Sequence, residues 1–139
     1  MNGIEDKRIL VTGASSGIGQ AIAIRLAAEG GRVGINYFRS QEGAEATRNE
    51  IQNAGSRHSP ILLRADLADG SAVDAMFDQF LEEMGGIDIL INNAAWQVES
   101  PSHETSRSDF ESILATNLTG AFHCACLLYT SPSPRDRVQ

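Results

Sequence analysis

The chain has 139 residues, 42% of them hydrophobic, which suffices for one domain with its own core. Its formal net charge is −7, from 11 basic and 18 acidic residues without a basic cluster, so nucleic acid is not expected as a partner. No apolar run approaches the length of a membrane span and the first residues do not resemble a secretory signal, so no membrane partner is expected either.

Apolar runs alternate with stretches of helical periodicity along the chain. We predict strands over residues 7–12, 32–37, 60–65 and 87–91. We predict helices over residues 17–30, 41–54 and 71–84, each closed by glycine.

A last helix is predicted to begin after a cap at Ser106. One of its faces is apolar and carries Phe110, Ile113, Leu114, Leu118 and Phe122. Apolar strands separated by helices imply a parallel sheet covered on both faces. The predicted fold is therefore α/β, a doubly wound Rossmann-type sheet in three layers (α/β/α) that stops after the helix following the fourth strand.

A glycine-rich loop, Thr12–Gly19, connects the first strand to the first helix with the spacing G-x-x-x-G-x-G. Gly13 permits a sharp turn, Gly17 lets backbone approach a pyrophosphate, and Gly19 lets the helix pack closely. The free N–H groups at the helix start would face the phosphates. The alternative is a glycine-rich turn that binds nothing.

Four landmarks follow one another in order: Thr12–Gly19, Asp66-Leu67, Asn92–Ala95 and Asn117. Together they resemble the classical short-chain dehydrogenase/reductases over residues 7–125. Residues 97–104 and 116–122 are most similar to bacterial glucose 1-dehydrogenases and the related acyl-carrier-protein reductases. The resemblance implies an NAD(P)-dependent oxidoreductase that transfers a hydride between nicotinamide and a small-molecule carbonyl or secondary alcohol. It also implies a homotetrameric parent enzyme.

The predicted cofactor-binding residues lie in the glycine loop and at the strand ends: Gly13, Ser15, Ser16, Gly17, Ile18, Gly19, Tyr37, Arg39, Ser40, Asp66, Leu67, Asn93, Ala94 and Ala95. Asp66 could accept a hydrogen bond from the adenine amino group, or it could simply be a turn or cap residue. Asn93 could equally hold neighbouring strands together.

The end of the second strand bears on the choice of cofactor. A guanidinium at Arg39 and a hydroxyl at Ser40 suit a 2′-phosphate, so NADP is favoured and NAD remains possible. The alternative for Arg39 is an ordinary solvated arginine.

Asn117 is the one catalytic residue assigned, because the resemblance implies that it binds a water of the proton relay. The family's chemistry also needs a tyrosine, a lysine four residues later and a serine about a dozen residues earlier. The tyrosines here are Tyr37 and Tyr129 and the sole lysine is Lys7, none in that pattern. We therefore expect the isolated chain to be inactive. Because truncation would leave the fourth strand as an exposed apolar edge and the last helix without its packing partners, we also expect low solubility and weak cofactor affinity. A non-catalytic dinucleotide-binding or sensor protein is the alternative.

Residues 126–136 match a reading frame of the transposase adapter used to prepare sequencing libraries. We interpret residues 1–125 as the cofactor-binding part of one domain and residues 126–139 as an artefactual, disordered tail, because Pro132 and Pro134 cannot continue a helix. A natural Ser-Pro tail is the alternative. Cys124 and Cys126 are too close for an ordinary disulfide and lack zinc-site neighbours, so no metal site is predicted and a reducing, cytoplasmic location fits best.

Overall fold

Four parallel strands form the centre of the protein in a computed structural model that describes residues 3–131. Their order across the sheet is β3-β2-β1-β4. The strands are β1 (Arg8–Val11), β2 (Arg32–Tyr37), β3 (Ile61–Arg64) and β4 (Ile89–Ile91). This arrangement confirms the predicted Rossmann-type sheet, and each strand lies within its predicted range.

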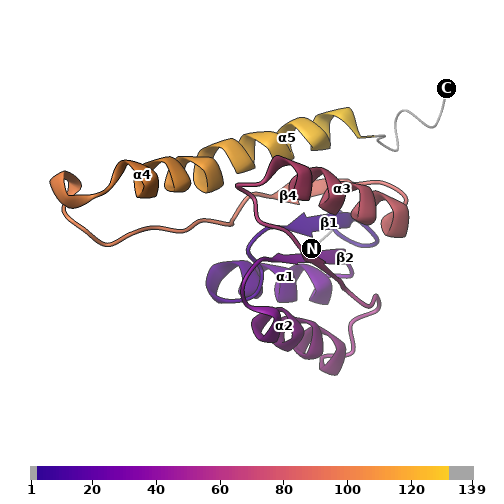
Figure 1. Cartoon of the computed structure of the whole chain (residues 1–139). Helices are drawn as coiled ribbons and strands as arrows, with labels where there is room; N and C mark the ends of the chain where they lie inside the picture. The colour runs from indigo at the N-terminus through magenta and orange to yellow at the C-terminus, as the bar shows by residue number, and fades with distance from the viewer. Residues whose placement is uncertain (1–2, 132–139) are drawn as a thin grey trace.

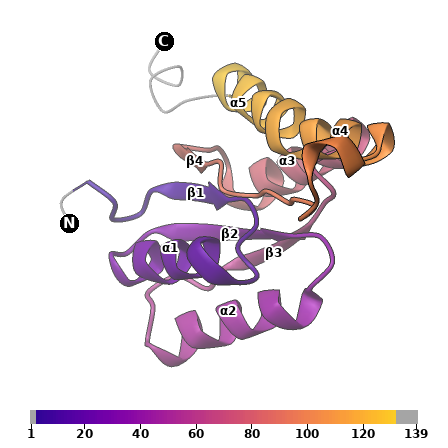
Figure 2. The same cartoon turned by 90° about the vertical axis from the view of Figure 1, so that its left-hand side faces the viewer.

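Helices cover both faces of this sheet, as Figures 1 and 2 show. One face carries α1 (Gly17–Ala28) and α2 (Gln41–Asn53), and the other carries α3 (Gly70–Met84). Successive strand residues point to opposite faces, so Leu10 joins the core beneath α3 while Ile9 and Val11 join the core beneath α1 and α2. The two cores give the three predicted layers.

An ion pair joins the starts of β1 and β4. The Arg8 Nε and Nη2 atoms donate to the Asp88 carboxylate at 2.9 and 3.0 Å, and the Arg8 backbone N–H adds a bond of 2.8 Å. Both side chains are about nine-tenths buried. The hydrogen bonds from Arg8 lower the pKa of Asp88, and those to Asp88 raise the pKa of Arg8.

After β4 the chain passes through a loop with a short 3₁₀ turn (η1, Ser102–Glu104) into a long helical segment. This segment comprises α4 (Arg107–Leu114), a π-helical stretch η2 (Ala115–Gly120) and α5 (Ala121–Thr130). The predicted cap is confirmed, because the Ser106 hydroxyl accepts a bond of 3.0 Å from the Asp109 N–H. The wider π-helical stretch was not predicted.

The end of α5 corrects one prediction. Helix α5 runs to Thr130, so the disorder predicted from residue 126 onward is wrong for residues 126–130. Leu127 and Leu128 pack against the core beneath α3, and the first proline of the predicted tail comes only at position 132. The rest of the predicted tail, residues 132–139, lies outside the described residues, and the adapter origin of the segment stays a prediction.

The helix from Arg107 to Thr130 is longer than the apolar runs recognised in the sequence, none of which approached the length of a membrane span. Its 24 residues are long and apolar enough, by length and composition alone, to cross a membrane. One side packs on α3 through the fully buried Cys124. The other exposes an apolar stripe in which four large side chains are 40–68% exposed: Phe110, Leu114, Leu118 and Phe122. Figure 1 shows α4 extending past the sheet.

Candidate functional site

The ends of the strands, together with the glycine loop, enclose a pocket of about 600 Å³. The predicted cofactor-binding residues line it, with the single exception of Ser40. Residues far apart in the sequence therefore meet at one site. The pocket also includes residues that the sequence did not assign to the cofactor: Asn36, Phe38, Ala65, Ala68, Trp96, Ser112 and Thr116.

The glycine loop has the geometry that its spacing predicts. Gly13 and Gly17 have φ values of +63° and +56°, in the left-handed region that side chains disfavour. A Cβ at Gly13 would lie 2.8 Å from the Ala94 Cα, whereas the space around Gly17 is open. A Cβ at Gly19 would clash with the Gly13 carbonyl and the Asn93 amide. Close packing around Gly13 and Gly19 thus leaves Gly17 as the open edge of the loop.

The first turn of α1 has uncapped N–H groups beside this open edge. Ser16 is the N-cap residue, yet its side chain makes no capping hydrogen bond. By contrast, Ser40, Asp69 and Ser106 each cap the helix that follows them. An uncapped helix start with its positive dipole end suits an anionic group such as a pyrophosphate.

Thr12 and Asn93 fasten the glycine loop to β4. The Asn93 Nδ2 donates to the carbonyls of Thr12 and Gly13 at 3.0 and 3.1 Å. In return, the Thr12 Oγ1 accepts from the N–H groups of Asn93 and Ala94, both at 3.0 Å. The prediction that Asn93 holds neighbouring strands together is confirmed, while its contact with a cofactor stays a prediction.

Asn36 performs a similar task on the other side of the loop, and the sequence analysis missed it. Its side chain is almost fully buried, and its Oδ1 accepts from the Gly13 N–H at 3.0 Å. Its Nδ2 lies 3.2 and 3.3 Å from the carbonyl oxygens of Leu63 and Ala65. The available signal was an asparagine within an apolar strand, because a buried amide must find partners.

Asp66, Arg39 and Ser40 were predicted to bind the adenosine end of the cofactor, and the structure places them differently: Asp66 and Arg39 line the pocket, and Ser40 does not. Asp66 accepts a bond of 3.0 Å from the Ala68 N–H through Oδ1, so its turn role is confirmed. Its second carboxylate oxygen has no hydrogen-bond partner within residues 3–131. Arg39 lines the pocket. Ser40 does not, because its hydroxyl accepts from the Gly43 N–H at 3.1 Å and caps α2.

Asn117 lies outside the pocket lining and holds one of its walls in place. Its Oδ1 accepts from the Trp96 N–H at 3.0 Å, and its Nδ2 donates to the Trp96 carbonyl at 2.9 Å. The Trp96 indole N–H donates to the Ser112 carbonyl at 3.3 Å. These bonds join the loop after β4 to the helix, so that Trp96, Ser112 and Thr116 form one wall of the pocket.

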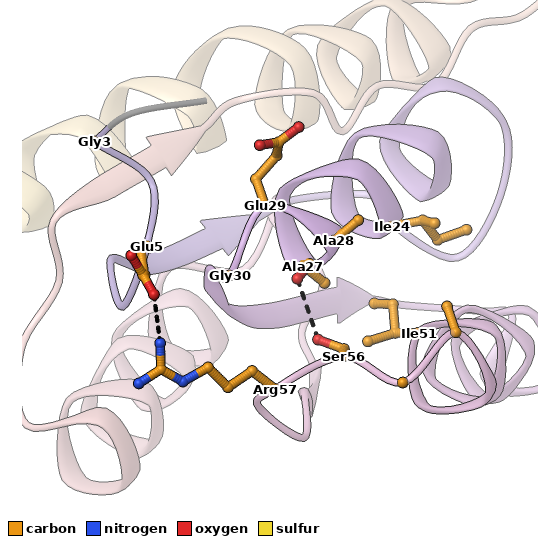
Figure 3. Close-up of a pocket in the computed structure, with 12 residues that line it drawn as sticks. Gly3, Glu5, Ile24, Ala27, Ala28, Glu29, Gly30, Ile51, Ser56 and Arg57 are labelled. Atoms are coloured by element: carbon orange, nitrogen blue, oxygen red, sulfur yellow. Dashed lines mark hydrogen bonds and ion pairs between the residues drawn. The ribbon is translucent and has the colours of Figure 1, made fainter.

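A second cavity, of about 630 Å³, lies where α1 and α2 end. Figure 3 shows the Arg57 guanidinium beside the Glu5 carboxylate and the Ser56 hydroxyl beside the Ala27 carbonyl. The ion pair between Arg57 and Glu5 measures 2.5 Å, and the Ser56 hydroxyl donates to the Ala27 carbonyl at 3.2 Å. The remaining carboxylate, Glu29, is paired with Arg25 at 2.6 Å. None of the predicted site residues lines this cavity, and its charged side chains are already paired. The pocket at the strand ends is therefore the candidate functional site.

Comparisons with known proteins show the family to which the chain is similar. A family model described as short chain dehydrogenase matches residues 7–132. The chain is 40% identical over 119 residues to 3beta-hydroxysteroid dehydrogenase 1 of Eggerthella lenta, covering 86% of this chain and 45% of that protein. It is 38% identical over 118 residues to a 3-oxoacyl-(acyl-carrier-protein) reductase of Staphylococcus aureus, covering 85% and 47%. The chain thus spans about half the length of these relatives.

Solved structures show the same likeness. A short chain dehydrogenase from Burkholderia cenocepacia in complex with NADP superposes with a TM-score of 0.85 at 38% identity, covering 92% of this chain and 51% of that one. A blue fluorescent protein from a metagenomic library in complex with NADPH superposes with a TM-score of 0.82 at 31% identity, covering 92% and 52%.

Proposed function

Because the chain belongs to the short-chain dehydrogenase family, we propose that it is the cofactor-binding part of an NAD(P)-dependent oxidoreductase. When bound, the nicotinamide would supply or accept the hydride exchanged with a carbonyl or secondary alcohol. One observation carries the proposal: the uncapped start of α1 and the open, left-handed Gly17 face the pocket where the strands end. This is the site at which a parallel sheet of this topology binds a dinucleotide.

The residues that line the pocket, and Asn117 just outside the lining, have proposed tasks. The N–H groups of the first turn of α1 bind the pyrophosphate, and the free carboxylate oxygen of Asp66 accepts from the adenine amino group. Ala94 and Ala95, with small side chains, let backbone approach the nicotinamide ribose. Asn117 keeps a second hydrogen-bonding position on each amide atom beyond those used by Trp96, and these positions hold the relay water.

The cofactor is NADP in preference to NAD. Arg39 lines the pocket just past the end of β2, where a guanidinium attracts a 2′-phosphate. The NADP and NADPH complexes of the structural relatives support the same preference. Replacing Arg39 by alanine should lower the ratio of NADPH to NADH affinity about tenfold, measured by titration of each cofactor. An unchanged ratio would remove Arg39 from phosphate binding.

The substrate is a small carbonyl or alcohol compound, and the likeness of residues 97–104 and 116–122 favours a sugar of the glucose 1-dehydrogenase type. The catalytic serine and the Tyr-x-x-x-Lys pair would follow residue 125 in the whole protein, which acts in the cytoplasm. The apolar stripe on the long helix is an interface between subunits of a homotetramer, since four large apolar side chains are exposed there. The second candidate is a non-catalytic dinucleotide-binding or sensor protein, which a complete downstream sequence without Tyr-x-x-x-Lys would favour.

Direct titration tests the proposal on the chain as it stands. Trp96 is the sole tryptophan and lines the pocket, so bound NADPH should quench its emission. We expect saturable binding of one NADPH per chain by calorimetry and fluorescence, and weaker binding of NADH. Circular dichroism would establish that the sample is folded. A folded chain that binds neither cofactor would refute the proposed function.

A further inference from the structure

Two arginines gather on one exposed aromatic ring at the rim of the pocket. The Arg39 Cζ lies 5.7 Å and the Arg64 Cζ 5.3 Å from the centroid of the Phe38 ring. The Arg64 Nε also donates to the Phe38 carbonyl at 3.2 Å. Arg64 is the last residue of β3 and is paired in register with Tyr37 at the end of β2. Two neighbouring strand ends thus bring two guanidiniums to one place.

Neither of these guanidiniums has a carboxylate partner. Within residues 3–131, no carboxylate oxygen lies within 4.0 Å of Arg39 or Arg64, although the chain carries a net charge of −7. Other arginines are paired with carboxylates: Arg8, Arg25, Arg48 and Arg57. Cation–π contacts orient Arg39 and Arg64 without neutralising them. The rim therefore has two positive charges available for an anionic ligand.

The two arginines lie at the rim of the pocket. Phe38 and Arg39 line the pocket, whereas Arg64 lies outside the lining and contacts it through Phe38. Resting on the proposed function, we propose that Arg64 is a second determinant of NADP specificity, which joins Arg39 in holding the 2′-phosphate while Phe38 orients both guanidiniums. A phosphate dianion attracts positive charge, so a second cation at the rim of the pocket would strengthen its binding.

The test compares NADPH with NADH, since the two differ at the 2′-phosphate. We expect Arg64→Gln to raise the Kd for NADPH about tenfold and to leave the Kd for NADH within about twofold, as measured by calorimetry on the full chain. Arg64→Lys keeps the positive charge and should recover most of the NADPH affinity.

Arg32→Gln is the matched control, because it removes one positive charge at the opposite end of β2. Because Arg32 begins the six-residue strand β2 and Arg39 follows its end, Arg32 lies about 20 Å from the arginine pair. This distance exceeds the screening length of about 8 Å at 0.15 M salt. Its cofactor affinities should match those of the parent chain.

The outcomes separate the two proposals. A parent chain that binds neither cofactor would overturn the proposed function and this inference with it. A chain that binds both, but keeps its NADPH to NADH ratio in Arg64→Gln, would overturn the inference alone. A lysine variant as weak as the glutamine variant would also overturn it, since the role assigned to Arg64 is that of a charge.

Discussion

Gly17→Ala should separate cofactor binding from folding at the glycine loop. The residue has φ +56° and nothing within 4 Å of an added Cβ, so the folded chain would carry backbone strain of about 1 kcal/mol without a clash. The methyl group would occupy the open edge where we place the pyrophosphate. Losing one charge-assisted hydrogen bond there costs about 1.5–3 kcal/mol, which corresponds to a rise of about 10- to 150-fold in the Kd for NADPH.

Gly55→Ala is the matched control. Gly55 has φ +75°, also has nothing within 4 Å of an added Cβ, and follows α2 at the second cavity. Both variants should lose similar unfolding free energy in urea, measured by circular dichroism, while only Gly17→Ala should lose NADPH affinity by calorimetry. Equal NADPH affinity in the two variants would refute the assignment of the phosphate site to this loop.

Three further changes test other parts of the structure. Asp88→Asn leaves its buried guanidinium partner unpaired and should lower the unfolding free energy by about 3 kcal/mol at pH 7 in urea titrations, whereas the exposed Asp78→Asn should change little. The folded-state pKa of Asp88 is lowered below its ordinary value of 3.8. Its contribution to the unfolding free energy is therefore present above pH 3.8 and is lost as the pH falls through the folded-state pKa. The Asp88→Asn variant should lack this acid-dependent loss of stability. Gly19→Ala forces a clash with backbone and should lower the melting temperature far more than Gly55→Ala does. Leu118→Glu combined with Phe122→Glu should reduce self-association in sedimentation experiments, and an unchanged mass would argue against the apolar stripe as an interface.

The strands and the glycine loop could be predicted from the sequence because their signals are local. Short apolar runs separated by helices that end at glycine predict buried parallel strands, and the spacing of Gly13, Gly17 and Gly19 predicts the loop between strand and helix. Ser106 could be recognised as a cap for the same reason. The predicted residues of the site meet in space because the strand ends of a parallel sheet lie at one edge.

Other features depend on contacts between distant residues and could not be predicted in this way. Asn36 meets carbonyls 27 and 29 residues later, at Leu63 and Ala65, so its role depends on the assembled sheet. The side chain of Asn117, in the π-helical stretch, bonds to the Trp96 backbone 21 residues earlier. Helix α5 extends past residue 125 because its leucines pack on the core beneath α3, a contact that local proline rules do not anticipate.

Resequencing the source DNA across codon 125 tests the central claim most directly, namely that these residues are the cofactor-binding part of a short-chain dehydrogenase. We predict that the natural reading frame departs from Cys126–Gln139 and continues into a serine followed by Tyr-x-x-x-Lys, and that the whole protein oxidises or reduces a small alcohol or carbonyl with NADP(H). A natural frame that encodes Cys126–Gln139 and then stops would contradict the catalytic proposal and leave a dinucleotide-binding protein.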